Sequence, residues 1–239
     1  MDGNARTVIE LDDAVAVLGG FPALAGATLT VSTGEIVLLR GPNGAGKTSL
    51  LRLCAGLLPI ARGSGRVLGL DLTTAREAIR RRVGLLGHAN GLYADLSVAE
   101  NVGFWGSTVA ASPVEIRAAL DRLGLAGRLA GLRVRTLSAG ERRHTALACL
   151  VARRAELWLL DEPHAGLDAD GRDELDAVLR QAATSGATIV VASHELERAG
   201  SLATRTVHVV AGQVVAEQVA GEPDRPTDGQ IGDTSEGLQ

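Results

Sequence analysis

Lysine is almost absent from this sequence. The 239 residues contain 24 Lys and Arg together, and Lys47 is the single lysine among them. It stands in the glycine-rich stretch GPNGAGKTS at positions 41–49. Because Lys and Arg serve equally well on a solvated surface, a lysine kept at one position indicates a site that needs a compact ammonium group.

Aromatic side chains and excess positive charge are also scarce. Two Phe, two Trp and one Tyr are the only aromatics, so Leu, Val and Ala must supply most of the core. The formal net charge is −4. The segment 222–239 carries five acids and one Arg, which leaves the rest of the chain formally neutral. This balance gives no support for a nucleic-acid partner.

Cysteine and membrane-spanning signals are similarly sparse. Cys54 and Cys149 lie far apart in apolar stretches, which predicts two buried free thiols in a reducing compartment rather than metal ligands. The first residues are acidic, unlike a signal peptide. The uncharged stretch 14–34 contains several Gly and a Pro, which favour strands and turns over a membrane span. We therefore expect a cytoplasmic protein, with any membrane span belonging to a partner.

Short apolar runs alternate with helical stretches, which predicts an α/β fold. Runs of this length suit buried strands of a parallel sheet; they are 35–40 (EIVLLR), 83–87 (VGLLG), 157–161 (LWLLD) and 188–193 (TIVVAS). Helices are expected at 48–58 and 113–123, the second with Ser112 and Glu115 as a capping box. Ser97 and Glu100 form another such box.

Other segments surround this core. Residues 7–31 and 206–217 look like antiparallel hairpins, and helices dominate from about 90 to 137. We expect a helical subdomain over about 90–150 inserted into the α/β core. After Gly221 the chain becomes rich in Pro, Asp and Gly, and we predict that the acidic tail 222–239 is disordered.

The stretch GPNGAGKT matches the phosphate-loop pattern G-x-x-x-x-G-K-[ST], between a predicted strand and a predicted helix. Its glycines allow backbone N–H groups to surround phosphate oxygens, and the helix N-terminus adds positive potential. Lys47 then reaches the β- and γ-phosphates, and Thr48 offers a hydroxyl to Mg²⁺. The predicted nucleotide-binding residues here are Gly41, Pro42, Asn43, Gly44, Ala45, Gly46, Lys47, Thr48 and Ser49.

Acidic residues follow the strand at 157–161. Asp161 and Glu162 stand at its carboxyl end, where α/β folds place ligands. Asp161 is predicted to hold Mg²⁺ and Glu162 to polarise the water that attacks the γ-phosphate. His194 follows the strand 188–193 and is predicted to contact the γ-phosphate. These residues complete the expected ATP and Mg²⁺ site.

The stretch LSAGE at 137–141 forms a second small-residue loop before a helix, and so a second anion site. One ATP does not need both sites from one chain. We therefore predict a two-fold dimer in which Ser138, Ala139 and Gly140 of one copy close over the ATP held by the other.

Together these motifs strongly resemble the ATP-binding subunits of ABC transporters. GPNGAGKT corresponds to Walker A, LSAGE to the signature motif, LWLLDE to Walker B, AGLD at 165–168 to the D-loop and His194 to the switch histidine. The match runs from about 7 to 217. It implies a RecA-like P-loop core with an antiparallel β flank, one ATP-binding domain over 1–221, nucleotide contact by Asp168, and an integral membrane subunit as partner.

Three positions depart from the family pattern. Leu18 stands where an aromatic usually stacks on adenine, although nearby Phe21 is an alternative. Ala139 replaces a signature glycine. His88 replaces the Q-loop glutamine. It is either a tolerated polar substitute or a residue that contacts Mg²⁺ or the attacking water, and the second interpretation predicts a pH-sensitive ATPase.

Gly87 and His88, together with LSAGE, also resemble the ATP-binding subunits of haem exporters in cytochrome c maturation. That narrower resemblance implies haem as cargo and a position on the cytoplasmic face of the cell membrane. The histidines have no metal-cluster spacing, so the membrane subunits must carry the haem. An exporter of another small molecule shares the same motifs.

Three of the five aromatics, Tyr93, Phe104 and Trp105, follow His88 closely. They form either the core of the helical subdomain or a groove for a helix of the membrane subunit. Two other functions stay open. A soluble ABC-type ATPase that remodels a protein or cofactor assembly is one, and an ATP-binding regulatory module without turnover is the other; Glu162 argues against the latter.

Overall fold

A six-stranded sheet forms the centre of the computed structural model, which describes residues 6–87 and 90–219. Its strand order is β10-β9-β3-β8-β7-β6, and all of its neighbouring pairs are parallel except β9 with β10. The strands are β3 (Ile36–Arg40), β6 (Val83–Leu86), β7 (Leu157–Asp161), β8 (Thr188–Ala192), β9 (Arg205–Val210) and β10 (Gln213–Val219). The four predicted apolar strands are therefore confirmed to within one residue.

A second sheet is antiparallel, with the order β2-β1-β4-β5. It contains β1 (Thr7–Leu18), β2 (Phe21–Ser32), β4 (Arg62–Val67) and β5 (Leu70–Asp71). The hairpin of β1 and β2 was expected. Strand β4 was not predicted, because RGSGRV is polar and glycine-rich and lacks strand-like alternation. The strand forms instead through its pairing with β1 and through the close packing of its glycines. A Cβ at Gly65 would lie 2.8 Å from Leu11.

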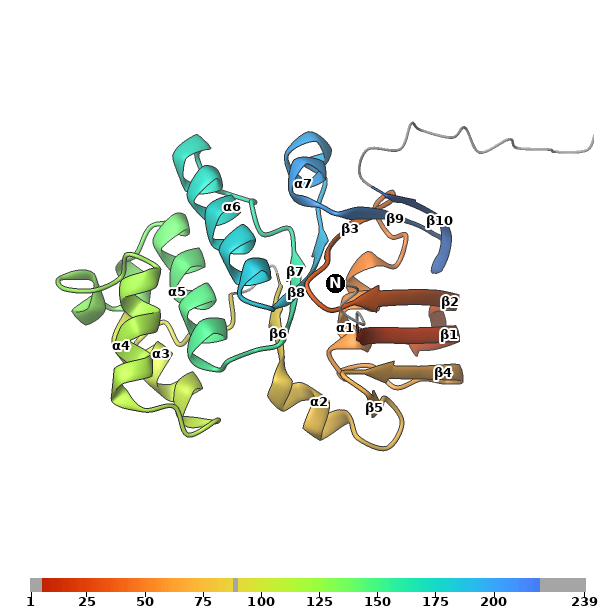
Figure 1. Cartoon of the computed structure of the whole chain (residues 1–239), viewed down its shortest axis with the longest axis horizontal. Coiled ribbons are helices and arrows are strands. Elements are labelled where there is room, and N and C mark those ends of the chain that lie inside the picture. The colour runs from red at the N-terminus through yellow and green to blue at the C-terminus, as the bar shows by residue number, and fades with distance from the viewer. Residues whose placement is uncertain (1–5, 88–89, 220–239) are drawn as a thin grey trace, which may run out of the picture.

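The helices between residues 98 and 152 lie on the opposite side of the parallel sheet from the antiparallel sheet (Figure 1). Within the described residues, α3 (Val98–Ser107), α4 (Pro113–Arg122) and α5 (Ala139–Ala152) pack against one another. Short 3₁₀ turns at η1 (Leu129–Gly131) and η2 (Val134–Thr136) join α4 to α5. The predicted capping boxes of α3 and α4 are present, and Ser138 with Glu141 forms a third at α5.

Four further helices complete the description: α1 (Lys47–Cys54), α2 (Arg76–Arg82), α6 (Ala169–Thr184) and α7 (Leu196–Leu202). Helix α1 ends before the expected residue 58, because Gly56 adopts a left-handed φ of 68° that breaks the helix. No helix in 6–87 or 90–219 has the length and apolar content needed to cross a membrane. His88 and the predicted tail 222–239 lie outside the described residues.

Two hydrophobic cores cover the two faces of the parallel sheet. One lies between the sheets and encloses α1, while the other lies under the helical layer. Cys54 belongs to the first and Cys149 to the second. Burial raises the pKa of both thiols to about 12, which fits the expectation of inert, apolar cysteines. This double coverage leaves the carboxyl ends of the strands as the open edge where a site can form.

Candidate ATP site

The phosphate loop follows β3 and turns into α1 at Gly46. Gly46 adopts a φ of 107°, and a Cβ there would lie 2.9 Å from the Ala23 carbonyl. A Cβ at Gly41 would lie 2.1 Å from the Val209 carbonyl. Both glycines are therefore required by close backbone approach as well as by dihedral angle. The turn directs the free N–H groups of the first turn of α1 toward one cavity.

Lys47 is the first residue of α1 and is only 7 % exposed. Its Nζ donates hydrogen bonds to the carbonyls of Gly41 at 2.7 Å and Pro42 at 3.0 Å. The ammonium is thus held inside the curve of its own loop. A planar guanidinium, with its larger fork, does not fit this closed space. The geometry gives a physical reason for a lysine at this position.

Thr48 and Asp161 bring the two halves of the site together. The Thr48 hydroxyl donates to Asp161 Oδ2 at 2.7 Å, across 113 positions of sequence. A hydroxyl and a carboxylate are hard oxygen ligands of the kind that Mg²⁺ accepts while keeping several waters. No group of three or more His, Cys, Asp or Glu able to hold a metal occurs in the described ranges. The pair therefore fits a nucleotide-bound Mg²⁺ better than a metal site built by protein alone.

Glu162 has an unusual backbone. Its φ is 50°, in the left-handed region that a non-glycine residue rarely adopts. Its N–H donates to the Ala192 carbonyl at 2.8 Å, and its carbonyl accepts from Arg143 Nη2 at 3.3 Å. Such strained backbone persists where surrounding contacts over-determine it, and it clusters at active sites.

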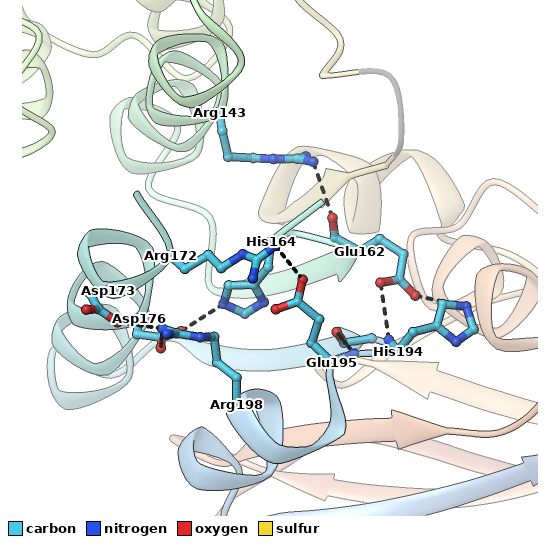
Figure 2. Close-up of polar contacts among 10 residues, drawn as sticks. Arg143, Glu162, His164, Arg172, Asp173, Asp176, His194, Glu195 and Arg198 are labelled. Carbon is cyan, nitrogen blue, oxygen red and sulfur yellow. Dashed lines mark hydrogen bonds and ion pairs between the residues drawn. The ribbon is translucent and has the colours of Figure 1, made fainter. Parts of the chain in front are cut away.

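His194 lies beside Glu162, in the segment after β8 (Figure 2). The His194 backbone N–H donates to Glu162 Oε2 at 3.2 Å, and His194 Nε2 lies 3.3 Å from Glu162 Oε1. The imidazole is more than half exposed. Glu162 and His194 therefore form a pair at adjacent strand ends, with the ring open to the cavity.

One cavity of about 550 Å³ collects these groups. Its lining includes the predicted residues Asn43, Gly44, Ala45, Gly46, Lys47, Thr48, Ser49, Asp161, Glu162 and His194. Pro22, Ala23, Ala211 and Gly212 complete the wall. Phe21, beside the wall residue Pro22, is 77 % exposed, and Leu18 is half exposed. Both apolar side chains at this end of the β1–β2 hairpin are free to meet a base.

Ser138, Ala139, Gly140 and Asp168 lie elsewhere. They line a second cavity of about 950 Å³, together with Gly166 and Leu167. Among the described residues, none lines both this signature cavity and the cavity of the phosphate loop. Asp168 also accepts from the Gly171 N–H at 2.9 Å as the N-cap of α6. A single copy therefore keeps its phosphate loop and its signature loop in separate places.

Two polar residues near the site, Arg143 and His164, are buried although no site role was predicted for them. Arg143 is 5 % exposed and donates to the carbonyls of Gly87 and Glu162; burial lowers the pKa of its guanidinium. The run RRH at 142–144 is typical of a solvated helix face, but α5 directs Arg143 inward, and the side chain of His144 is only 15 % exposed. His164 is fully buried and bonded to Asp176. Neither burial has a local sequence signal.

A phosphate loop between β3 and α1, with Asp161 and Glu162 at the carboxyl end of β7 in the same sheet, defines a P-loop nucleotide-binding ATPase. The family model described as "ABC transporter" matches residues 24–165. The chain belongs to the ABC transporter family and is an ATP-binding, ABC-type ATPase subunit.

Several curated relatives are similar over most of this chain. The cytochrome c biogenesis ATP-binding export protein CcmA of Rhodopseudomonas palustris is 44 % identical over 74 % of this chain and 87 % of its own. The protein of the same name from Chelativorans sp. is 38 % identical over 74 % and 86 %. A putative ABC transporter ATP-binding protein of Streptomyces avermitilis is 43 % identical over 92 % of this chain, but over only 39 % of its own length.

Solved structures share the fold. A structure titled as the ATP-binding subunit of an ABC transporter superposes with a TM-score of 0.81 at 25 % identity, covering 89 % of this chain and 90 % of its own. A bacterial Atm1-family ABC exporter with ATP bound has a TM-score of 0.78 at 21 % identity, covering 91 % and 41 %. The predicted cassette fold, with a parallel core and an antiparallel flank, is confirmed.

The enclosed Lys47 makes a direct prediction. A Lys47→Arg variant is expected to bind ATP about ten- to a hundredfold more weakly, because a charge-assisted bond of 1.5–3 kcal/mol is lost. Arg52→Lys, an exposed change in the same helix, is the matched control and should leave binding unchanged. Nucleotide titration by calorimetry measures both, and equal affinity for Lys47→Arg and wild type contradicts the geometric argument.

Proposed function

We propose that this chain hydrolyses ATP in the 550 Å³ cavity as the energy-coupling subunit of a membrane exporter. The observation that carries the proposal is the convergence of an enclosed ammonium, the Thr48–Asp161 pair and the Glu162–His194 pair on one cavity. A binding module without turnover needs the first two features but not the third.

Each side chain has a distinct role in this proposal. Lys47 and the loop N–H groups bind the β- and γ-phosphates. Glu162 accepts the proton of the attacking water as general base. His194 contacts the γ-phosphate through its exposed ring and orients it toward Glu162. The protein wall of the cavity has a lower effective dielectric constant than water, which strengthens these electrostatic contacts.

Thr48 and Asp161 are the proposed magnesium ligands. When bound, Mg²⁺ neutralises charge that develops on the phosphate oxygens. Asp161 is already oriented by its hydrogen bond from Thr48 at 2.7 Å, so both oxygens lie on the cavity wall before the ion arrives. His88, the third predicted ligand, lies outside the described residues and stays a prediction.

The separate signature cavity supports action as a two-fold dimer. Ser138, Ala139 and Gly140 surround the N-terminus of α5, which offers N–H groups and positive potential to an anion. An ATP held on the phosphate loop of one copy would complete this site in the other. Two-fold symmetry then creates two equivalent ATP sites and leaves no signature loop unused.

An apolar cavity of about 400 Å³ between the sheet core and the helical layer is the proposed dock for a membrane subunit. Its lining includes Leu57, Leu85, Trp105, Cys149 and Leu150. Arg153 stacks over Trp105 at 5.1 Å, and Arg80 lies on the wall. Neither arginine has a carboxylate partner in the described ranges, which favours a docking helix that is apolar and carries an acid. The chain would then sit on the cytoplasmic face of the membrane.

The aromatics Tyr93, Phe104 and Trp105 were expected to form either the core of the helical subdomain or a groove for the membrane subunit. Trp105 is half buried, packs on the core under the helical layer, and also lines the apolar cavity. Tyr93 and Phe104 are exposed, and their rings make a T-shaped contact with centroids 5.0 Å apart. Trp105 therefore serves both core and groove, whereas Tyr93 and Phe104 lie at the surface.

Haem destined for cytochrome c biogenesis is the proposed cargo. The support is the 38–44 % identity to the cytochrome c biogenesis export proteins named above, over about three quarters of this chain. Gly87, His88 and LSAGE in the sequence agree with it. The membrane subunits would carry the haem, because the described part of this chain contains no suitable ligand cluster.

Glu162→Gln tests the catalytic role. The amide keeps the size of the side chain but cannot accept the proton, so ATP turnover should fall about 10²–10⁴-fold. ATP affinity should stay near the wild-type value, because Lys47 and the loop are intact. Glu77→Gln, at an exposed position on α2 that lines neither cavity, is the control. Turnover that survives Glu162→Gln excludes Glu162 as the base.

Substitutions in the apolar cavity test membrane coupling. Trp105→Ala and the surface variant Leu57→Ser, at a residue 49 % exposed, should weaken recovery of the membrane complex and leave basal ATPase intact. Val114→Ser is the control, because Val114 is exposed on α4 outside this cavity. Loss of ATPase and of thermal stability in both cavity variants would favour a purely structural role.

Affinity isolation of the intact membrane complex tests the cargo. The chain should copurify with an integral membrane subunit, and the complex should show the Soret absorbance of bound haem. A complex that transports but never contains haem contradicts haem export and indicates another small molecule. Recovery with a soluble assembly alone would favour the remodelling alternative.

A further inference from the structure

His164 is a buried histidine that the proposed hydrolysis does not use. Only 1 % of its surface is exposed, and its Nε2 lies 2.8 Å from Asp176 Oδ1. A carboxylate only accepts, so Nε2–H is the donor. His164 Nδ1 has no partner within the described residues. His164 stands two positions after Glu162, and Asp176 lies on α6.

Asp176 connects this histidine to α7. Its second oxygen, Oδ2, accepts from Arg198 Nη1 at 2.8 Å, and Arg198 Nη1 also donates to Asp173 Oδ1 at 2.7 Å. Burial of Asp176 is nearly complete, while Arg198 reaches toward solvent. Figure 2 shows Asp176 of α6 between His164, from the segment after β7, and Arg198 of α7. Burial of both His164 and Asp176 shields this contact from water.

A second ion pair anchors the same segment. Arg172 Nη2 of α6 lies 3.2 Å from Glu195 Oε1, and Glu195 directly follows His194. The Glu195 N–H donates to Ser193 Oγ at 3.1 Å. The segment from 193 to 198, which contains His194, is therefore attached to α6 at two points that follow the histidine, Glu195 and Arg198.

These contacts close a ring around the catalytic pair. The backbone connects Glu162 to His164, and side-chain contacts then connect His164 to Asp176 and Asp176 to Arg198. The backbone of α7 leads from Arg198 back to His194, whose N–H donates to Glu162 and so completes the ring. Buried ion pairs contribute little net stability after desolvation, and they are better attested as devices that specify one arrangement. The unpartnered Nδ1 of His164 adds a further cost.

We propose that the His164–Asp176–Arg198 network is a positioning device that holds His194 against Glu162. His164, Asp176 and Arg198 are positioning residues, since none lines the ATP cavity. The inference rests on the roles proposed for Glu162 and His194. Because His164 directly precedes the D-loop at 165–168, and Asp168 at its end is the N-cap of α6, movement of that loop would also move the switch histidine.

A double substitution separates positioning from stability. His164→Phe with Asp176→Leu replaces the buried polar pair by apolar groups of similar size, and Arg198 keeps Asp173 as its partner. Such replacements are often neutral for folding. We expect a retained unfolding midpoint and ATP affinity, but a kcat lower by about ten- to a hundredfold, as a misplacement of about 1 Å causes. His164→Gln, whose amide can still donate to Asp176, should recover part of kcat.

Hydrogen exchange gives a readout that does not depend on turnover. The His194 amide donates to Glu162 Oε2, so its exchange should become faster by about tenfold or more in the double variant. The matched control is Arg180→Met with Thr184→Val, two changes at exposed positions of the same helix α6 that line neither the ATP cavity nor the signature cavity. That control should change neither kcat nor exchange at His194.

Activity and hydrogen exchange together decide whether the network positions His194. A folded double variant with wild-type kcat and wild-type exchange at His194 overturns the proposal. If the double variant does not fold, the folded His164→Gln and Arg198→Met variants decide: preserved kcat and exchange in Arg198→Met overturns it as well. Faster exchange at His194 supports positioning even if Glu162→Gln retains turnover, and that last result would refute only the proposed catalytic roles.

Discussion

The contact between the Thr48 hydroxyl and the Asp161 carboxylate is the constraint on which the site depends. It joins residues 113 positions apart, and it forms because β8 pairs with both β3 and β7. That order places the phosphate loop after β3 and the acids after β7 at one edge of the sheet. The phosphate loop and the two proposed magnesium ligands are then neighbours by topology, and no loop has to reach across the molecule.

Local chemistry was readable from the sequence, but long-range burial was not. The phosphate loop, the buried strands and the capping boxes at Ser97 and Ser112 each depend on a few adjacent residues, and each was predictable. Strand β4 exists only through its pairing with β1. Arg143 appears solvated in the run RRH, and its burial follows from the packing of α5 against the sheet. His164 and Asp176 meet because α6 folds back over the segment after β7.

The two proposed anion sites of one chain constrain how two copies can close around nucleotide. The phosphate loop begins α1, and the signature loop begins α5 in the helical layer, so two different parts of the fold present helix N-termini to separate cavities. Glu141 caps the α5 loop from within the chain, which fixes its shape without a ligand. A preformed second site lowers the ordering cost of closing two copies around nucleotide.

Glu162 shows how the helical layer can act on the chemistry. Its strained backbone is held at three atoms: N–H by Ala192 of β8, carbonyl by Arg143 of α5, and carboxylate by the His194 N–H. Arg143 also donates to the Gly87 carbonyl, next to the Q-loop position. A rotation of the helical layer would therefore pull on the backbone of the proposed base directly. Since strained backbone persists only where surrounding contacts hold it, these three elements together fix the position of the proposed base.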